Sequence, residues 1–291
     1  MPTRVNINGT ISASEEARVS VFDHGFLYGD SIYESFRTYR KRPILFERNF
    51  ARLEKAACGI SLQVPWSAEK LRTEVYRTID AANNVGESLV RIIVTRGEGD
   101  LTPDPDSCDR PNILIIALPL HAPADNLYRD GISIIISGLK RDTHIASIKT
   151  GNLIHQVLGA QEASAKNAVE AIFLTPDGYV SDGTRSNIYF VKDDDVLTPA
   201  SEVGIVAGIT RSLVLEVAGE IGIRIREEKF VPTEVQDADE AFITSTTRGI
   251  LPVTRVDGRQ VGDGTVGQVT QRLMNAFRQR VDALAGEGRG G

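Results

Sequence analysis

The chain of 291 residues is poor in cysteine, methionine, tryptophan and histidine, with two, two, one and four of each. Cys58 and Cys108 are isolated thiols without the spacing of a disulfide framework, which is typical of a reducing, cytoplasmic setting. The four histidines never fall at the spacing of metal ligands. We therefore expect a cytoplasmic protein without a metal site.

Long apolar runs and a strong excess of one charge are also absent. No segment approaches the length of a membrane span, and the start, MPTRVNINGT, lacks the apolar core of a secretion signal. The net charge of −6 argues against nucleic acid or an anionic membrane as the main partner. With 41% hydrophobic and 25% charged residues, the composition is that of a globular protein of one large or two ordinary domains.

Lysine is scarce too, since the chain has 25 arginines and only 8 lysines. Lys149 stands in IASIKTGNLIHQ, residues 145–156, beside Ile145, Ala146 and Ile148. A solvated surface lysine is one interpretation. The other is a nucleophilic amine that bonds to a carbonyl cofactor, because apolar neighbours favour the uncharged amine.

Local patterns predict an α+β protein. Asn8-Gly9 indicates a hairpin, and YESFRTY alternates so that Tyr33 and Arg37 share a face. Further strands are predicted for SLVRIIVTR, NILIIAL, GISIIISG, EAIFLT, SNIYFV and EAFITST. Helices are predicted over 47–57, after Ser67, over 152–166, after Gly208 and from Val266 to Phe277, with a frayed GEGRGG end. Strands and helices do not alternate regularly, which favours α+β over a doubly wound sheet.

The segment PLHAPAD, residues 119–125, has two prolines and no periodicity. It predicts a linker between a small N-terminal domain, 1–118, and a larger C-terminal domain, 126–291.

Asp182 in YVSDGTRSNIYF is a candidate acid for an imine-forming cofactor such as pyridoxal phosphate, which needs a carboxylate at its ring nitrogen. A hairpin turn at Asp182-Gly183 is the alternative. However, Asp177-Gly178 already turns the chain, and the three residues between the two pairs are too few for an ordinary strand. One Asp-Gly pair therefore has another role.

Two segments could hold the phosphate of such a cofactor. AGITR, residues 207–211, places Gly208 before a predicted helix, so the amides of Ile209 and Thr210 would point at an anion, unless Thr210 simply caps the helix. TSTTRG, residues 244–249, carries four hydroxyl side chains at the end of a strand, although a polar strand end is also common.

Taken together, these motifs resemble the class IV (fold-type IV) pyridoxal-phosphate transaminases, the group of branched-chain and D-amino acid aminotransferases and aminodeoxychorismate lyases. The resemblance runs in order through DHGFLYGDSIYESFRTY, FERNFARLEKAA, IKTGNLIHQVLGAQEA, GYVSDGTRSNIYFV, GITRSLVLEVAGEIGI and the segment from DEAFITSTTRG onward. It implies a two-domain fold, with a small α/β domain and a larger mixed-sheet domain, the cofactor pyridoxal 5′-phosphate and a homodimer. Amino acids and 2-oxo acids are the implied substrates.

The resemblance also implies residue roles. Lys149 matches the lysine that bonds to the cofactor's aldehyde and moves the proton between the substrate's Cα and the cofactor's C4′. Asp182 matches the acid at the ring nitrogen. The phosphate-binding positions match Arg52, Ile209, Thr210 and Thr246. The positions around the substrate pocket of the branched-chain enzymes match Tyr28, Tyr33, Arg37, Arg91 and Thr247.

Three departures bear on the substrate. The family usually has Glu at Asp182, and Leu153 stands where branched-chain enzymes often place a tyrosine. Arg185 replaces a small residue, and it is either a clamp for the substrate carboxylate or a surface residue. The loop GEGDLTPDP resembles the branched-chain type and lacks the arginine-x-histidine motif of D-amino acid enzymes.

We therefore expect a transaminase acting on branched-chain or aliphatic L-amino acids with an acceptor such as 2-oxoglutarate. A D-amino acid or (R)-amine transaminase is the alternative, ahead of a lyase. A phosphate-ligand binding protein and a scaffold protein are the alternatives outside enzymes.

Overall fold

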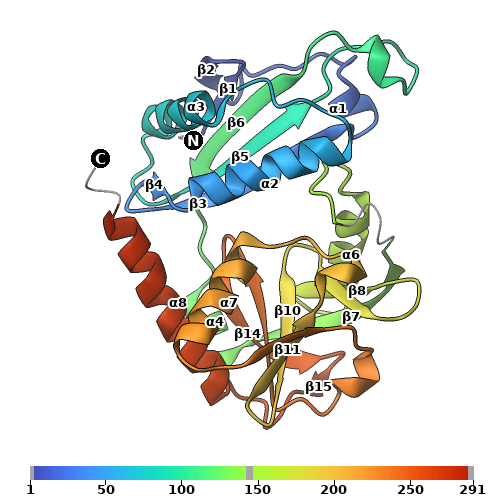
Figure 1. Cartoon of the computed structure of the whole chain (residues 1–291), viewed down its shortest axis with the longest axis vertical. Coiled ribbons are helices and arrows are strands. Elements are labelled where there is room, and N and C mark those ends of the chain that lie inside the picture. Colours follow the sequence, from blue (N-terminus) through green and yellow to red (C-terminus); the bar gives the residue numbers. More distant parts are fainter. Residues whose placement is uncertain (1–2, 142–146, 288–291) are drawn as a thin grey trace. The chain divides into compact units, whose positions relative to one another are not determined.

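The computed structural model describes residues 3–141 and 147–287 and divides the chain into two compact units (Figure 1). Unit 1 comprises Met1–His121, Ile148–Leu153 and Ala283–Gly291. Unit 2 comprises Ala122–Ser147 and Ile154–Asp282. The predicted linker holds the end of a strand at Pro119 and the start of a helix at Asp125. Ile145, Ala146 and the final GRGG lie outside the described residues.

Unit 1 is built on an antiparallel sheet with the strand order β2-β1-β6-β5-β3-β4. The strands are β1 Arg4–Ile7, β2 Thr10–Ala13, β3 Ser31–Tyr39, β4 Arg42–Pro43, β5 Ser88–Thr95 and β6 Asn112–Pro119. The helices are α1 His24–Leu27, α2 Phe46–Gly59 and α3 Ala68–Ala82, with a short 3₁₀ turn η1 at Pro105–Ser107. The predicted Asn8-Gly9 hairpin is confirmed, and both residues have positive φ.

The core of unit 1 lies between the sheet and helices α2 and α3. Leu53 of α2 and Leu71 of α3 join Ile32, Phe36 and strands β5 and β6 in one buried cluster. Ser67 caps α3 as predicted, because its side chain accepts a hydrogen bond from Lys70 N. Period-two alternation leaves Tyr33, Ser35, Arg37 and Tyr39 on the other face of β3.

Unit 2 has, among its described residues, a mixed sheet of nine strands. Its order is β12-β11-β10-β13-β14-β7-β8-β9, with β15 paired to β14, and the β7–β8, β7–β14 and β11–β12 pairs are parallel. The strands are β7 Ile132–Lys140, β8 Glu170–Leu174, β9 Val180–Gly183, β10 Asn187–Lys192, β11 Asp195–Pro199, β12 Ile225–Glu228, β13 Glu240–Ser245, β14 Gly249–Val256 and β15 Arg259–Gln260.

The helices described in this part of the sequence are α4 Asp125–Asp130, α6 Ile154–Ala165, α7 Ile209–Glu220 and α8 Gln268–Glu287, with 3₁₀ turns η2 Ser201–Val203 and η3 Pro232–Glu234. Helix α6 contacts β7 and β8, α7 contacts β12 and β13, and α4 contacts β14. Gly208 is the N-cap of α7, as predicted, so the alternative in which Thr210 caps the helix is wrong. Helix α8 differs from the prediction, because it starts at Gln268 and leaves Val266 outside.

The two units together give the α+β fold predicted from the sequence, because one sheet is antiparallel and the other mixed. No helix within residues 3–141 and 147–287 is long and apolar enough to cross a membrane.

Candidate active site

Lys149 lies beside the edge of β3 in unit 1. The amide of Tyr33 donates to the carbonyl oxygen of Lys149 at 3.0 Å, and Thr150 forms an antiparallel bridge with Ile32. Successive side chains of an extended segment point to opposite sides, so Ile148 packs against the unit 1 core while Lys149 faces away from it. The Lys149 Nζ lies 4.1 Å from the centroid of the Tyr33 ring, a cation–π contact.

Two arginines share this face of the sheet with Lys149. The guanidinium of Arg91 lies 4.9 Å from the Tyr33 ring centroid, and its Nε donates to Ser35 Oγ at 3.2 Å. The guanidinium of Arg37 lies 4.4 Å from the Tyr39 ring centroid. Its Nε is buried and has no hydrogen-bond partner among the residues that the structure describes. An amine and a guanidinium that share the Tyr33 ring are suited to a ligand that carries a carboxylate.

Tyr28 and Arg52 make other contacts. The Tyr28 hydroxyl donates to the carbonyl oxygen of Leu101 at 2.5 Å. Arg52, on α2, binds Glu34 with two hydrogen bonds of 2.7 and 2.6 Å from the helix-covered side of β3. The Glu34 side chain is only 1% exposed, so the guanidinium of Arg52 is held in a fixed orientation.

Asp182 is a buried acid of unit 2. The turn of this segment is at Asp177-Gly178, where Gly178 has positive φ, and Asp182 lies within strand β9 with 3% exposure. Arg141 forms an ion pair with its Oδ1, and the amide of Val206 donates to its Oδ2 at 3.1 Å. Burial raises the pKa of Asp182, while Arg141 and the Val206 amide act in the opposite direction. The Oδ2 oxygen retains a second lone pair for a further donor.

The start of α7 lies close to Asp182, because the Val206 amide that bonds to Asp182 is two residues before the N-cap Gly208. No side chain caps the helix at Gly208, so the amides of Ile209 and Thr210, which open the helix, have no intrahelical acceptor. A side chain at position 208 would collide with Asn187 Oδ1, which explains the glycine. Asn187 in turn donates from Nδ2 to the carbonyl oxygen of Val206 at 3.0 Å.

Asn187 also connects this site to the hydroxyl-rich turn. It lies opposite Thr244 in the β10–β13 pair, one residue before the end of β13. Thr246 and Thr247 follow in the turn between β13 and β14, and Ser245 Oγ is buried without a hydrogen-bond partner among the described residues. Asp182, the start of α7 and the 246–248 turn therefore gather in one region of unit 2. Arg185, in the turn after β9, has an exposed side chain.

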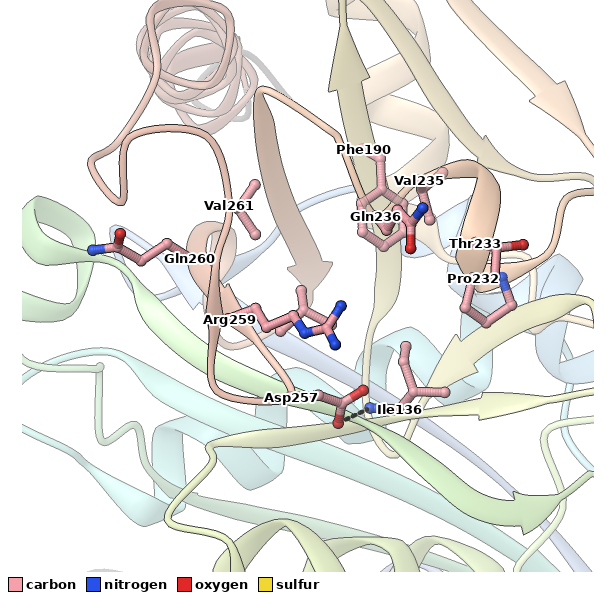
Figure 2. A pocket seen from close by; sticks show the side chains of 11 residues that line it. Ile136, Phe190, Pro232, Thr233, Val235, Gln236, Asp257, Arg259, Gln260 and Val261 are labelled. Atoms are coloured by element: carbon pink, nitrogen blue, oxygen red, sulfur yellow. Dashed lines mark hydrogen bonds between the residues drawn. The ribbon is translucent and has the colours of Figure 1, made fainter.

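These residues fit pyridoxal phosphate. Unit 2 supplies a buried carboxylate for a ring nitrogen, free helix amides and an unpaired hydroxyl for a phosphate. Taken by itself, unit 1 holds an amine suited to an aldehyde and a guanidinium suited to a carboxylate around the Tyr33 ring. A separate pocket of about 340 Å³ on unit 2 lies between η3, β7, β10 and the β14–β15 hairpin (Figure 2). It is lined by none of the predicted site residues.

Four residues that hold the site together were not identified from the sequence: Glu34, Arg141, Glu170 and Arg248. The sequence pattern could have indicated a buried, paired Glu34, because this residue lies between Ile32 and Phe36 on the apolar face of an alternating strand. No local pattern indicates the roles of Arg141 and Arg248, because their ion-pair partners are 41 and 78 residues away in the chain.

Comparisons with known proteins agree with this chemistry. Residues 31–256 match the sequence model of the amino-transferase class IV family. A Methanocaldococcus jannaschii protein assigned as a branched-chain-amino-acid aminotransferase is 35% identical over 94% of this chain and 95% of its own. The D-alanine aminotransferase of Listeria monocytogenes is 32% identical over 98% of each chain.

Solved structures are similar over nearly the whole chain. The branched-chain amino acid aminotransferase of Escherichia coli superposes with a TM-score of 0.89 at 29% identity, covering 95% of this chain and 93% of that one. Another branched-chain amino acid aminotransferase, solved with pyridoxamine 5′-phosphate, also gives 0.89, at 27% identity over 97% of this chain and 94% of its own. The chain therefore belongs to the class IV aminotransferases and is a transaminase that depends on pyridoxal 5′-phosphate.

Proposed function

We propose that this transaminase moves the amino group of branched-chain or other aliphatic L-amino acids to a 2-oxo acid such as 2-oxoglutarate. The observation that carries the proposal is the face of β3 on which Lys149, Arg37 and Arg91 lie together. The Arg91 guanidinium, which shares the Tyr33 ring with the Lys149 amine, favours a substrate with a carboxylate over a simple amine, and Arg37 lies further along the same face.

Lys149 supplies the amine that holds the cofactor and the base that moves the proton. When bound, pyridoxal phosphate supplies an electron-accepting ring for the electrons left at the substrate's Cα. Lys149 would hold the cofactor through its aldehyde, and once the substrate has taken that place its Nζ would take the proton from the substrate's Cα. The Tyr33 ring, 4.1 Å from Nζ, orients the amine and shields one side of it from water.

Asp182 holds the proton at the cofactor's ring nitrogen. Its carboxylate is fixed by Arg141 and by the Val206 amide, so it accepts from the ring nitrogen without reorienting. Asp is one methylene shorter than Glu, and Arg141 compensates by fixing its position.

Within unit 2, the phosphate is bound by the amides of Ile209 and Thr210 and by the turn at Thr246. Arg52, in unit 1, is a phosphate-binding residue on the family resemblance alone. Substrate contacts come from Tyr28, Tyr33, Arg37, Arg91, Arg185 and Thr247. Arg37 is the substrate residue that most clearly lacks a hydrogen-bond acceptor, because its buried Nε has none in the described part of the chain. A substrate carboxylate would provide one.

A D-amino acid transaminase is the second candidate, with an (R)-amine enzyme behind it. It is supported by the D-alanine aminotransferase relatives of 31–33% identity, by Leu153 and by the exposed Arg185. Branched-chain aminotransferases are among the similar solved structures, and the arginines on the Lys149 face disfavour an amine without a carboxylate.

Initial rates with L-leucine, D-alanine and (R)-phenylethylamine, each with 2-oxoglutarate, distinguish the candidates. We expect L-leucine to be the best donor and (R)-phenylethylamine to be inert. Turnover of D-alanine with no turnover of L-leucine would assign the enzyme to the D-amino acid type. Arg37→Gln should raise the KM for the amino acid about tenfold or more.

We also infer a cytoplasmic homodimer. A patch of exposed apolar side chains on unit 1 supports it: Val21, Phe22, Phe26 and Leu101 are 49–68% exposed. The segments that carry them are joined, because the amide of Gly99 donates to the carbonyl oxygen of Phe22 at 3.2 Å. The two isolated cysteines favour the reducing location.

A further inference from the structure

Glu170, the first residue of β8, is a carboxylate with 0% exposure in unit 2. Its Oε1 accepts hydrogen bonds from the Thr184 hydroxyl and, at 3.1 Å, from the Arg185 amide. Its Oε2 accepts from Arg248 Nη1 at 2.6 Å. These partners come from two separate turns of the chain. A buried carboxylate requires such partners, because an unpaired charge away from water is very costly.

The first turn, residues 183–186, joins β9 to β10. Gly183 N donates to the carbonyl oxygen of Ser186 at 2.7 Å, and Thr184 N donates to that of Ala171 at 3.0 Å. A Cβ at Gly183 would lie 3.2 Å from Glu170 Cγ, so the turn rests directly on the Glu170 side chain. This turn follows Asp182 and carries Arg185.

The second turn, residues 246–248, joins β13 to β14 and carries Thr246 and Thr247. Its last residue, Arg248, is fixed through both its backbone and its side chain. The carbonyl oxygen accepts from the Tyr128 hydroxyl at 2.8 Å, and the guanidinium, only 12% exposed, binds Glu170. The position of the turn is therefore tied to the charge of Glu170.

We propose that Glu170 is a positioning residue that couples these two turns through its ion pair with Arg248. The assignment rests on the proposed function for the roles of the turns, since one flanks the ring-nitrogen acid and the other holds the phosphate. Neither turn can shift without breaking a bond to the same buried carboxylate. Glu170 thus sets the spacing between the groups that bind the two ends of the cofactor.

Amide hydrogen exchange of the apoenzyme tests the coupling without cofactor or substrate, because a substitution in one turn is read out by the exchange rates of the other turn. Arg248→Gln changes only the second turn, and we expect faster exchange of the Arg185 amide in the first. Glu170→Gln keeps an acceptor for Thr184 and Arg185 but loses the ion pair, and we expect faster exchange across 246–248. Unchanged exchange in the opposite turn, in both variants, overturns the proposal.

Cofactor binding provides the second measurement. Each single variant should weaken pyridoxal phosphate binding about tenfold, because each leaves a buried charge unpaired. The double variant should lose about the same factor, not about a hundredfold, because the two residues act as one pair. Additive losses, or no loss, contradict the coupling.

Glu240→Gln is the matched control. Glu240 is also a carboxylate of unit 2 that joins separate segments, because it accepts from the amides of Val269 and Thr270 at 2.9 and 2.7 Å. It contacts neither turn, so its variant should bind the cofactor as the parent protein does.

Two further outcomes also decide the proposal. If Arg248→Gln does not unfold cooperatively, the variant is not properly folded, and Arg248→Lys replaces it. Arg248→Lys keeps the charge and should show a smaller increase in the exchange of the Arg185 amide. If the parent protein fails to bind pyridoxal phosphate, the proposed function is wrong, and the exchange measurement still decides whether the turns are coupled.

Discussion

Among single residues, three buried carboxylates hold the candidate site residues and turns in place. Glu34, Asp182 and Glu170 have almost no exposed surface, and each is paired with an arginine from another segment. Such pairs contribute little net stability compared with an apolar core, but the loss of one partner is costly. Their main effect is to fix the side chains and turns that are proposed to bind the cofactor.

The pair between Arg52 and Glu34 gives a residue-scale prediction for the apoenzyme. Arg52→Gln should lower the free energy of unfolding by about 3 kcal/mol, because it leaves Glu34 charged and buried. Chemical denaturation of the cofactor-free protein measures this change.

Arg72→Gln is the control for that experiment. Arg72 pairs with Glu47 between α2 and α3, but the two side chains are 45% and 63% exposed. Its loss should cost less than about 0.5 kcal/mol. Equal effects of the two substitutions would show that burial does not set the energy of the Glu34 pair.

Some of these residues could be identified from local patterns. Asp182 was singled out because two Asp-Gly pairs cannot both turn so short a segment, and the structure places Asp177-Gly178 in a turn and Asp182 within strand β9. Lys149 was identified by its apolar neighbours and by the family motif. Arg141 and Arg248 could not be, since their roles depend on how distant segments fold together.

At the scale of elements, periodicity predicted most helices and strands because each has one buried face. Helix α2 was expected over 47–57 and spans Phe46–Gly59. The start of α8 was placed too early, at Val266, because Glu240 of another element binds the amides of Val269 and Thr270 and fixes the helix start.

The contact between α3 and β1 predicts a pH dependence. Burial would raise the pKa of Glu74, but the hydrogen bonds from Asn6 and Arg77 outweigh it and hold the pKa below 4.5. A lowered pKa stabilises the fold above the unfolded value and loses this effect as the pH falls through the folded value.

Glu74→Gln should therefore lower the free energy of unfolding by about 1 kcal/mol at pH 7. The difference from the parent should shrink as the pH falls below 4.5. Glu69→Gln, an exposed position in the same helix, should change stability by less than about 0.5 kcal/mol. A Glu74 difference that is constant from pH 7 to pH 3 would contradict the assigned interaction.

At the scale of the molecule, the α+β class was predicted from the irregular order of elements, and two domains were predicted from the segment 119–125 and from the family resemblance. Strand order did not follow from the sequence, because pairing such as that of β14 with β7 is set by tertiary packing. The division into 1–118 and 126–291 with a linker at 119–125 stays a prediction. In the structure, Ile148–Leu153 clusters with the N-terminal unit.

The proposed dimer gives a prediction at this scale. Phe26 is 68% exposed within the apolar patch on unit 1, so Phe26→Ser should weaken dimerisation at least about tenfold, measured by sedimentation velocity across a dilution series. Val85→Ser is the control, since Val85 is 98% exposed and lies outside the patch. A monomeric parent, or dimers of equal strength in both variants, would contradict the proposed interface.

The most direct measurement is to locate the covalent attachment of the cofactor. The protein is loaded with pyridoxal phosphate, reduced with borohydride, digested and analysed by mass spectrometry. We predict that the reduced cofactor is found on Lys149 among the 8 lysines, and that Lys149→Ala carries none. Attachment at another lysine, or no attachment in the parent protein, would contradict the account.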